Sequence, residues 1–222
     1  PWRRGIYWAQ TVAPLLGWLV DRVGAKRVLL GANVAEAAGF TGYAFAHSLV
    51  SVLIRLDSTG PILFRQPRQG LGDTLFNVYK FRTMYQDRGD TRGQQQTQRD
   101  DPRITRIGAL LRRTSIDELP QLLNVLRGEM SLVGPRPHTP HMLVGDKRIF
   151  DIIDEYSFRH RVKPGITGLA QINGYRGAVD TPEHLRTRID YDLYYIDHWS
   201  LWLDLKIIFR TAFICFSGAN AY

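Results

Sequence analysis

A long uncharged run near the start of the chain limits its possible folds more than any other feature. The 18 residues from Ala37 to Ile54 contain no Asp, Glu, Lys or Arg, and they include several small residues. A helix needs about 20 apolar residues to cross a bilayer, and small residues allow close helix packing in lipid. The run therefore predicts a membrane-associated helix. A buried helix in a soluble core is the alternative.

The chain as a whole is basic and globular in composition. The 222 residues carry a formal net charge of +8, and 44% of them are hydrophobic, so a core can be buried. The positive charge indicates anionic partners, which include nucleic acid, an anionic membrane surface and phosphorylated substrates. The single cysteine, Cys215, excludes an intrachain disulfide and a cysteine-based zinc site.

Glycine and proline divide the middle of the chain into short elements. Between residues 101 and 177 they predict a helix over 120–127 that ends at Gly128, and a short strand over 130–133. A further helix is predicted over 180–196, because Pro favours the first helical position. The polar stretch 85–100 is typical of a surface loop. These elements predict an α+β fold that is mostly helical with short strands.

The apolar tail from Trp199 to Phe216 supports two interpretations. Trp202 lies near Lys206 and Arg210, and tryptophan beside basic residues is typical of an amphipathic helix in a membrane interface. A helix packed on a protein core explains the same pattern.

The sequence RRTSIDELPQ, residues 112–121, places two adjacent carboxylates after paired arginines. Ser115 and Glu118 match a capping box, in which both side chains satisfy backbone N–H groups at a helix start. Pro120 favours a different interpretation, because proline is unusual well inside a helix. A helix that begins nearer Glu118 leaves Asp117 at or just outside its N-terminus.

An aspartate at a helix N-terminus beside arginines is expected to keep a low pKa and stay ionised. Such a carboxylate can attack phosphorus, or it can hold Mg²⁺ against a diphosphate. Both roles require nearby cations to neutralise phosphate charge. The candidate cations are Lys80, Arg82, Arg136, Lys163 and Arg176. Signature motifs of phosphate-binding loops, dinucleotide-binding folds, zinc proteases and serine hydrolases are absent from the sequence.

Several longer stretches carry a family resemblance. They include LDSTGPILFRQPRQG, FNVYKFRTM, DPRITRIGALLRRTSIDELPQLLNVLRGEMSLVGPRP, VKPGITGLAQINGYRG and DYDLYYIDHWSLWLDLKIIF. From about residue 54 to residue 222 the chain resembles the bacterial sugar transferases, the monotopic polyprenyl-phosphate sugar-1-phosphate transferases. The C-terminal stretch is most similar to the undecaprenyl-phosphate glucose phosphotransferase branch.

The resemblance implies a two-step reaction. Asp117 attacks the phosphorus next to the sugar of a UDP-hexose and releases UMP, and the phosphosugar then passes to undecaprenyl phosphate. Glu118 is implied as the partner that orients Asp117 or deprotonates the acceptor phosphate. Mg²⁺ is implied beside the dyad, with Asp117 as its first protein contact. Other implied site residues are Lys80, Arg112, Arg136 and Arg176 for phosphate, and Asp192 as a polar site or scaffold residue.

The resemblance also implies an organisation and a location. Residues 1–54 are expected to form an N-terminal membrane segment, and residues 55–222 an interfacial, amphipathic catalytic domain. The expected place is the cytoplasmic face of the bacterial inner membrane, where the reaction begins the synthesis of a surface polysaccharide. The expected partners are UDP-hexose, undecaprenyl phosphate and membrane lipid, without nucleic acid. The sequence leaves the hexose and the oligomeric state open.

The N-terminal segment departs from the family pattern. Family members bend a re-entrant helix at a Ser-Pro pair, whereas this chain has no proline between Pro14 and Pro61. Residues 17–27 instead resemble a loop motif of major facilitator superfamily transporters, and the apolar run that follows resembles the next transporter helix. The alternative hypothesis is therefore an inactive hybrid that serves as a membrane-bound scaffold or transporter remnant.

Overall fold

A computed structural model describes residues 48–88, 96–98, 100–179 and 181–217. The chain divides into two compact units, residues 1–52 and residues 53–222. Most of the predicted membrane segment and the whole transporter-like motif lie outside the described residues. The predicted domain boundary after residue 54 stays a prediction. Among the helices in the described ranges, none combines the length and the apolar character needed to cross a bilayer.

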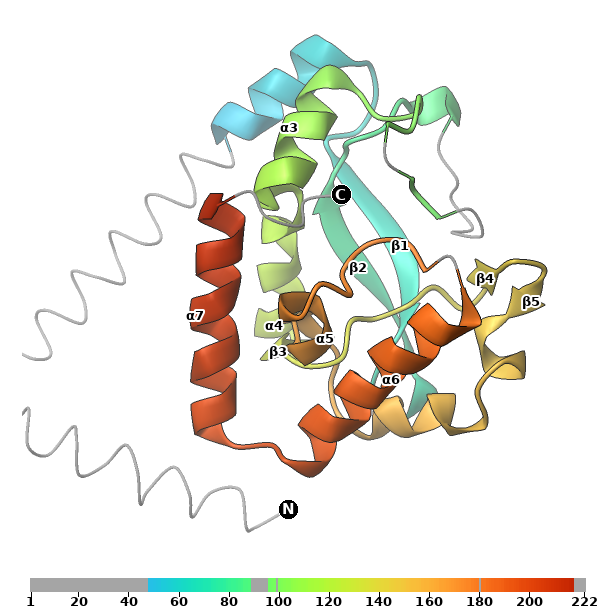
Figure 1. Ribbon diagram of the computed structural model, residues 1–222. Coiled ribbons are helices and arrows are strands. Elements are labelled where there is room, and N and C mark those ends of the chain that lie inside the picture. The colour runs from blue at the N-terminus through green and yellow to red at the C-terminus, as the bar shows by residue number, and fades with distance from the viewer. Residues whose placement is uncertain (1–47, 89–95, 99, 180, 218–222) are drawn as a thin grey trace, which may run out of the picture. The chain divides into compact units, whose positions relative to one another are not determined.

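The second unit is built around a two-stranded antiparallel hairpin (Figure 1). Strand β1 spans Leu63–Gln69 and β2 spans Leu75–Phe81, with Phe64 opposite Lys80. The short 3-10 helix η1, Leu71–Asp73, joins them. Gly72 adopts φ 60° within this connection, a backbone conformation that costs glycine little. The hairpin thereby presents Lys80 near the end of β2.

Helix α3, Arg106–Thr114, packs closely against the chain that leaves β2. Thr105 caps the helix by accepting a hydrogen bond from the Gly108 N–H at 2.9 Å. A Cβ atom at Gly108 would lie 2.1 Å from the Thr83 carbonyl oxygen, so only glycine permits this approach. The helix ends at Ser115, which has φ 61°. This left-handed residue redirects the chain immediately before the two carboxylates.

The segment after α3 is helical in two parts. The 3-10 helix η3 spans Ile116–Gln121, and helix α4 spans Leu122–Leu126. Gly128 follows with φ 76°, a conformation typical of residues that end helices. The structure therefore confirms a helical segment over 120–127 and the glycine predicted to end it. The part around Pro120 is 3-10 rather than α-helical.

A parallel strand pair lies beyond the helical segment. Strand β3, Ser131–Val133, pairs with β6, Gly165–Thr167, and confirms the predicted short strand. A Cβ atom at Gly165 would lie 2.1 Å from the backbone nitrogen of Gly134, so the two chains can approach only through glycine. The remaining short elements are β4 Leu143–Val144, β5 Lys147–Arg148, η2 Gln86–Arg88, η4 Ile149–Asp151, η5 Asp154–Arg161 and α5 Leu169–Ile172.

Helix α6, Pro182–Asp197, confirms the helix predicted over 180–196. Thr181 caps it by accepting a hydrogen bond from the His184 N–H at 3.1 Å. Its buried residues join a core cluster with the β4 and η5 regions. The members of that cluster are Met142, Val144, Ile149, Ile153, Tyr156, Val179, Leu185 and Ile189.

Helix α7, Leu201–Ser217, lies beside α3 at the left of the domain in Figure 1. It buries one side and exposes another. Ile207 is fully buried in a cluster with Val133, Ile172 and Tyr195. Trp202, by contrast, is 77% exposed. The packed-helix interpretation is therefore correct for one face, while the other face remains available to an interface. The described part of the chain confirms the α+β class with short strands.

Candidate active site

The two carboxylates lie in the first turn of η3, and the capping-box interpretation is wrong. Ser115 has a left-handed backbone and its side chain makes no capping hydrogen bond. The Glu118 side chain is directed to cations of other segments instead of back to the helix start. Charged partners stabilise a buried carboxylate more strongly than a single backbone N–H does. Tertiary contacts therefore override the local capping pattern.

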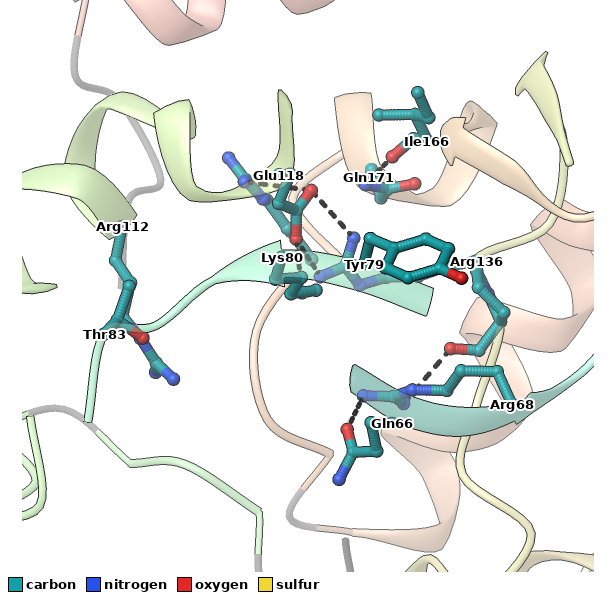
Figure 2. A network of polar contacts seen from close by, with 12 residues as sticks. Gln66, Arg68, Tyr79, Lys80, Thr83, Arg112, Glu118, Arg136, Ile166 and Gln171 are labelled. Carbon is teal, nitrogen blue, oxygen red and sulfur yellow. Dashed lines mark hydrogen bonds and ion pairs between the residues drawn. The ribbon is translucent and has the colours of Figure 1, made fainter. Parts of the chain in front are cut away.

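Glu118 is held by three cations. Figure 2 labels two of them, Lys80 and Arg136. Lys80 donates from Nζ to Oε1 at 2.8 Å. Arg136 donates from Nη2 to Oε1 at 2.6 Å and from Nη1 to Oε2 at 3.3 Å. Arg176 places Nη2 3.7 Å from Oε2. The cations come from β2, from the GPRP turn after β3 and from the loop after α5, so the fold assembles the cluster from distant segments.

This environment keeps Glu118 ionised. Burial opposes the charged form, but the charges of Arg136 and Lys80 and the Arg136 hydrogen bonds outweigh it, so the pKa of Glu118 lies well below its usual range. A carboxylate with such a low pKa is a weak base. Of the two roles implied for Glu118, orientation of the site therefore fits the geometry better than proton removal.

Asp117 has the opposite environment. Asp117 is 6% exposed. Among the described residues, the Asp117 carboxylate has no hydrogen-bond partner and no ion pair within 4.0 Å. Burial and the neighbouring charge of Glu118 raise the pKa of Asp117, while Lys80, Arg112 and Arg176 act in the opposite direction. The low pKa expected from the sequence is therefore wrong, because desolvation and the adjacent carboxylate outweigh the cations.

Asp117 lines a cavity of about 480 Å³ whose wall is rich in cations. The four residues that the sequence suggested for phosphate binding all line it: Lys80, Arg112, Arg136 and Arg176. Arg112 is oriented by its Nε, which donates to the Thr83 hydroxyl at 2.8 Å. The same wall includes basic residues that the sequence did not suggest, among them Arg68, His138 and Arg188. The cavity therefore suits a substrate with several negative charges.

Signals for two of these missed residues were present in the sequence. Arg68 lies within the quoted stretch LFRQPRQG, and Arg188 precedes Asp192 by four residues, which places both on one side of α6. Surface arginines have the same appearance in a sequence, so only burial distinguishes them. Arg188 is 3% exposed.

Asp192 is not among the residues that line the cavity. It is buried and accepts hydrogen bonds from Arg159, the shorter of them 2.5 Å from Nη2. Arg159 in turn donates from Nη2 to the Arg136 carbonyl oxygen at 2.7 Å. Of its two suggested roles, these contacts favour the scaffold role, because Asp192 holds the arginine that donates to the Arg136 backbone.

Two further cations suggested by the sequence have other places in the structure. Arg82 lines the cavity, but it donates to the carbonyl oxygens of Ser58 at 2.5 Å and Pro61 at 2.7 Å. It therefore ties the chain before β1 to the end of β2. Lys163 is not among the residues that line the cavity.

A second, apolar cavity of about 380 Å³ lies on the Glu118 side of the dyad. Arg176 lines both cavities. The apolar walls come from η3, α4, β3, β6, α5 and α7 and include Ile116, Leu119, Leu122, Leu132, Ile166, Ile172, Ile208 and Ile214. The dyad therefore separates a cationic cavity from a predominantly apolar one, which we call the apolar groove.

The described residues contain no group of three or more His, Cys, Asp or Glu side chains arranged to hold a metal ion. Asp117 is the carboxylate left without a hydrogen bond or ion pair at the dyad. A metal that takes most of its ligands from the protein does not fit this donor set. The predicted Mg²⁺ remains a prediction.

Together, the cationic cavity and the buried carboxylates form a site whose charge suits an anionic substrate. The chain matches the family described as bacterial sugar transferase over residues 27–218, and it belongs to that family. The predicted enzyme class, a sugar transferase, is thereby confirmed. The match begins upstream of residue 54, where the recognised motifs begin, so the family resemblance extends into the N-terminal segment.

The names of individual relatives specify a sugar and a lipid acceptor, which the family description does not. The chain is 59% identical over 164 residues to the undecaprenyl-phosphate glucose phosphotransferase of Komagataeibacter xylinus, covering 74% of this chain and 31% of that protein. It is 53% identical over 162 residues to the exopolysaccharide production protein PSS of Rhizobium leguminosarum bv. phaseoli, covering 73% and 81%. It is 51% identical over 199 residues to the UDP-glucose:undecaprenyl-phosphate glucose-1-phosphate transferase of Caulobacter vibrioides, covering 89% and 72%. The chain thus spans about a third of the first of these relatives.

Proposed function

We propose that this protein transfers a hexose 1-phosphate from a UDP-hexose to undecaprenyl phosphate and releases UMP. The observation that carries the proposal is Asp117, a buried carboxylate without a hydrogen bond or ion pair to a described residue, in a cavity lined by cations. The names of two relatives, which specify glucose 1-phosphate or glucose phosphate transfer to undecaprenyl phosphate, support the donor and acceptor classes. Glucose is the hexose that they favour.

In the proposed first step, an Asp117 oxygen attacks the phosphorus attached to the sugar. The new bond joins that oxygen to phosphorus, and the bond from phosphorus to the bridging oxygen breaks. The bridging oxygen keeps the electron pair and leaves as part of UMP. Lys80, Arg112 and Arg176 act electrostatically on Asp117, so they are placed to neutralise charge on the phosphoryl group. Glu118 stays ionised and holds Lys80 in position.

In the proposed second step, an oxygen of undecaprenyl phosphate attacks the same phosphorus and releases the Asp117 carboxylate. The apolar groove supports this step, because an isoprenyl chain is apolar and its phosphate is anionic. The groove is lined mostly by aliphatic side chains and has Arg176 in its wall. Since Arg176 also lines the cationic cavity, one guanidinium serves both substrates. The product is an undecaprenyl diphosphate hexose, which would begin the synthesis of a surface polysaccharide.

Mg²⁺ fits this site as a partner of the substrate. Mg²⁺ is usually bound through one or two carboxylates together with substrate phosphates, and Asp117 supplies one such carboxylate. When bound, Mg²⁺ would neutralise charge on the diphosphate. Glu118 is a poor second ligand because Lys80 and Arg136 already occupy its oxygens.

We further propose that α7 lies in the membrane interface at the cytoplasmic face of the inner membrane. Trp202, Phe209 and Phe213 are 77%, 79% and 70% exposed. Their spacing of seven and four residues places them on one face of a helix with 3.6 residues per turn. The exposed basic residues Lys206 and Arg210 lie nearby on the same helix, as expected beside anionic lipid headgroups.

The test is UMP release from a panel of UDP-hexoses by the full chain in detergent with undecaprenyl phosphate. Asp117→Asn is expected to abolish turnover, and intact-protein mass spectrometry without acceptor is expected to detect a phosphosugar adduct only on the unsubstituted protein. Asp190→Asn on the exposed side of α6 is the matched control and is expected to keep both signals. Folded protein that releases no UMP from any UDP-hexose would refute the proposal and favour the inactive scaffold.

A further inference from the structure

Two arginines in the cationic cavity, the buried Arg188 and the half-buried Arg68, have no role in the steps above. Arg188 donates from Nη2 to the Arg176 carbonyl oxygen at 3.0 Å, and its buried Nε has no hydrogen-bond partner among the described residues. Arg68 donates to the Pro137 carbonyl oxygen at 3.3 Å and to Gln66 Oε1 at 2.6 Å, as Figure 2 shows for Gln66. Neither guanidinium pairs with a carboxylate within 4.0 Å in the described part of the chain.

The negative charges near these two arginines, Glu118 for Arg68 and Asp192 for Arg188, do not offset their burial. Burial, followed by the charge of Arg136, lowers the pKa of Arg188 to about 9 and that of Arg68 to about 10. Arg136 is the charged residue with the largest effect on the pKa of both arginines. The cations that act on the pKa of Asp117 are Lys80, Arg112 and Arg176. Arg68 and Arg188 line the same cavity as Asp117, and we call these two arginines the second cationic region of the cavity.

His138 adds a neutral donor to the second region. Its Nδ1 lies 2.9 Å from Arg159 Nη1, and a guanidinium can only donate, so Nδ1 must accept. Burial and the charge of Arg159 keep the pKa of His138 well below its usual range, so the ring is neutral and carries its proton on Nε2. This Nε2 is buried and has no hydrogen-bond partner among the described residues. The ring lines the cavity.

We propose that Arg68 and Arg188, assisted by the Nε2–H group of His138, bind the phosphate of the nucleotide that leaves as UMP. All three groups are donors, and two carry positive charge, so they match a phosphate better than a neutral uracil or hexose. The donor diphosphate would then lie with its reacting phosphorus at Asp117 and its leaving phosphate in the second region. The guanidinium groups neutralise the charge that the bridging oxygen acquires when its bond to the reacting phosphorus breaks.

The proposal deepens the proposed function, but its test does not depend on turnover. The affinities of the full chain in detergent for UMP and for uridine are measured by calorimetry, because their ratio isolates the contribution of the phosphate. Arg188→Gln and Arg68→Gln are each expected to lower UMP affinity by about tenfold or more, in line with the loss of charged hydrogen bonds. The affinity for uridine is expected to stay unchanged. Arg188→Lys keeps the charge and is expected to lose less UMP affinity than Arg188→Gln.

Arg186→Gln is the matched control, because Arg186 lies on α6 two residues from Arg188 and is exposed. It is expected to leave the UMP-to-uridine ratio unchanged. Thermal unfolding identifies any variant that does not fold, in which case the other arginine decides the outcome. A ratio unchanged in both glutamine variants, an equal loss of uridine and UMP affinity, or no UMP binding by the unsubstituted protein would overturn the proposal. If UDP-hexoses yield no UMP but the ratio falls as expected, only the proposed function fails.

Discussion

Glu118→Gln removes one negative charge from among three cations while it preserves the size of the side chain. Lys80 and Arg136 would keep their charges at 2.8 Å and 2.6 Å from an oxygen that is now neutral. The Glu118 side chain is 6% exposed, whereas the side chains of its two partners are 21% exposed. Loss of one partner from a buried ion pair costs about 3–5 kcal/mol, and the partial exposure of the cations favours the lower end.

We therefore expect Glu118→Gln to lower the free energy of unfolding by about 3 kcal/mol at pH 7. In a protein of this size, each kcal/mol changes the melting temperature by about 2–4 °C, so the expected loss is about 6–12 °C. The folded pKa of Glu118 lies below its ordinary value of 4.5, so its stabilisation is fully present above pH 4.5. The stabilisation is lost as the pH falls through the folded pKa.

Urea unfolding of the full chain in detergent, followed by tryptophan fluorescence, measures both effects. The difference in unfolding free energy between the unsubstituted protein and the variant is expected to stay constant from pH 7 to about pH 5 and to become smaller at lower pH. Glu183→Gln on the exposed side of α6 is the control and is expected to change the unfolding free energy by less than about 0.5 kcal/mol. A Glu118→Gln variant within about 1 kcal/mol of the unsubstituted protein, or a difference that grows at low pH, would refute this account.

Three other changes test the surrounding structure. Asp192→Asn leaves Arg159 as a buried, unpaired charge and is expected to cost about 3–5 kcal/mol in urea unfolding; a loss below about 1 kcal/mol would contradict the scaffold role. Lys80→Gln removes a cation that lowers the pKa of Asp117, so the acid limb of the pH profile of kcat/KM for UMP release is expected to move to higher pH. An acid limb that stays in place or moves to lower pH would contradict the assignment of this limb to Asp117. Thr181→Ala removes the α6 cap and is expected to lower the free energy of unfolding by about 1 kcal/mol while kcat stays unchanged. A loss of activity without a loss of stability would contradict a role limited to capping.

Local signals in the sequence predicted several elements correctly. Thr181 and Pro182 mark the start of α6, and Gly128 follows the end of α4. These signals work because a side-chain cap, the fixed φ of proline and the left-handed freedom of glycine act within a few residues. The motifs also identified Lys80 and Arg136, both of which the structure brings to Glu118.

Other features depend on contacts between distant segments. The capping pattern at Ser115 was misleading, because Glu118 pairs with Lys80 on β2, 38 residues earlier in the chain. The raised pKa of Asp117 depends on burial, which neighbouring residues in the sequence do not reveal. Arg188 precedes Asp192 by four residues, but only its burial in the wall of the cationic cavity separates it from the exposed Arg186 on the same helix.

The sequence by itself determined the family and the two adjacent carboxylates, because motif identity and local backbone preference are properties of short segments. It could not distinguish the two acids, since Asp117 and Glu118 are neighbours that share the same arginine-rich surroundings in the chain. Only the tertiary structure decided that three cations contact Glu118, while Asp117 faces the cationic cavity without a hydrogen bond or ion pair to the described residues. The physical reason is that charge acts through space and depends on burial, so the fold determines which acid pairs with cations and which acid lines the cavity without such a pair.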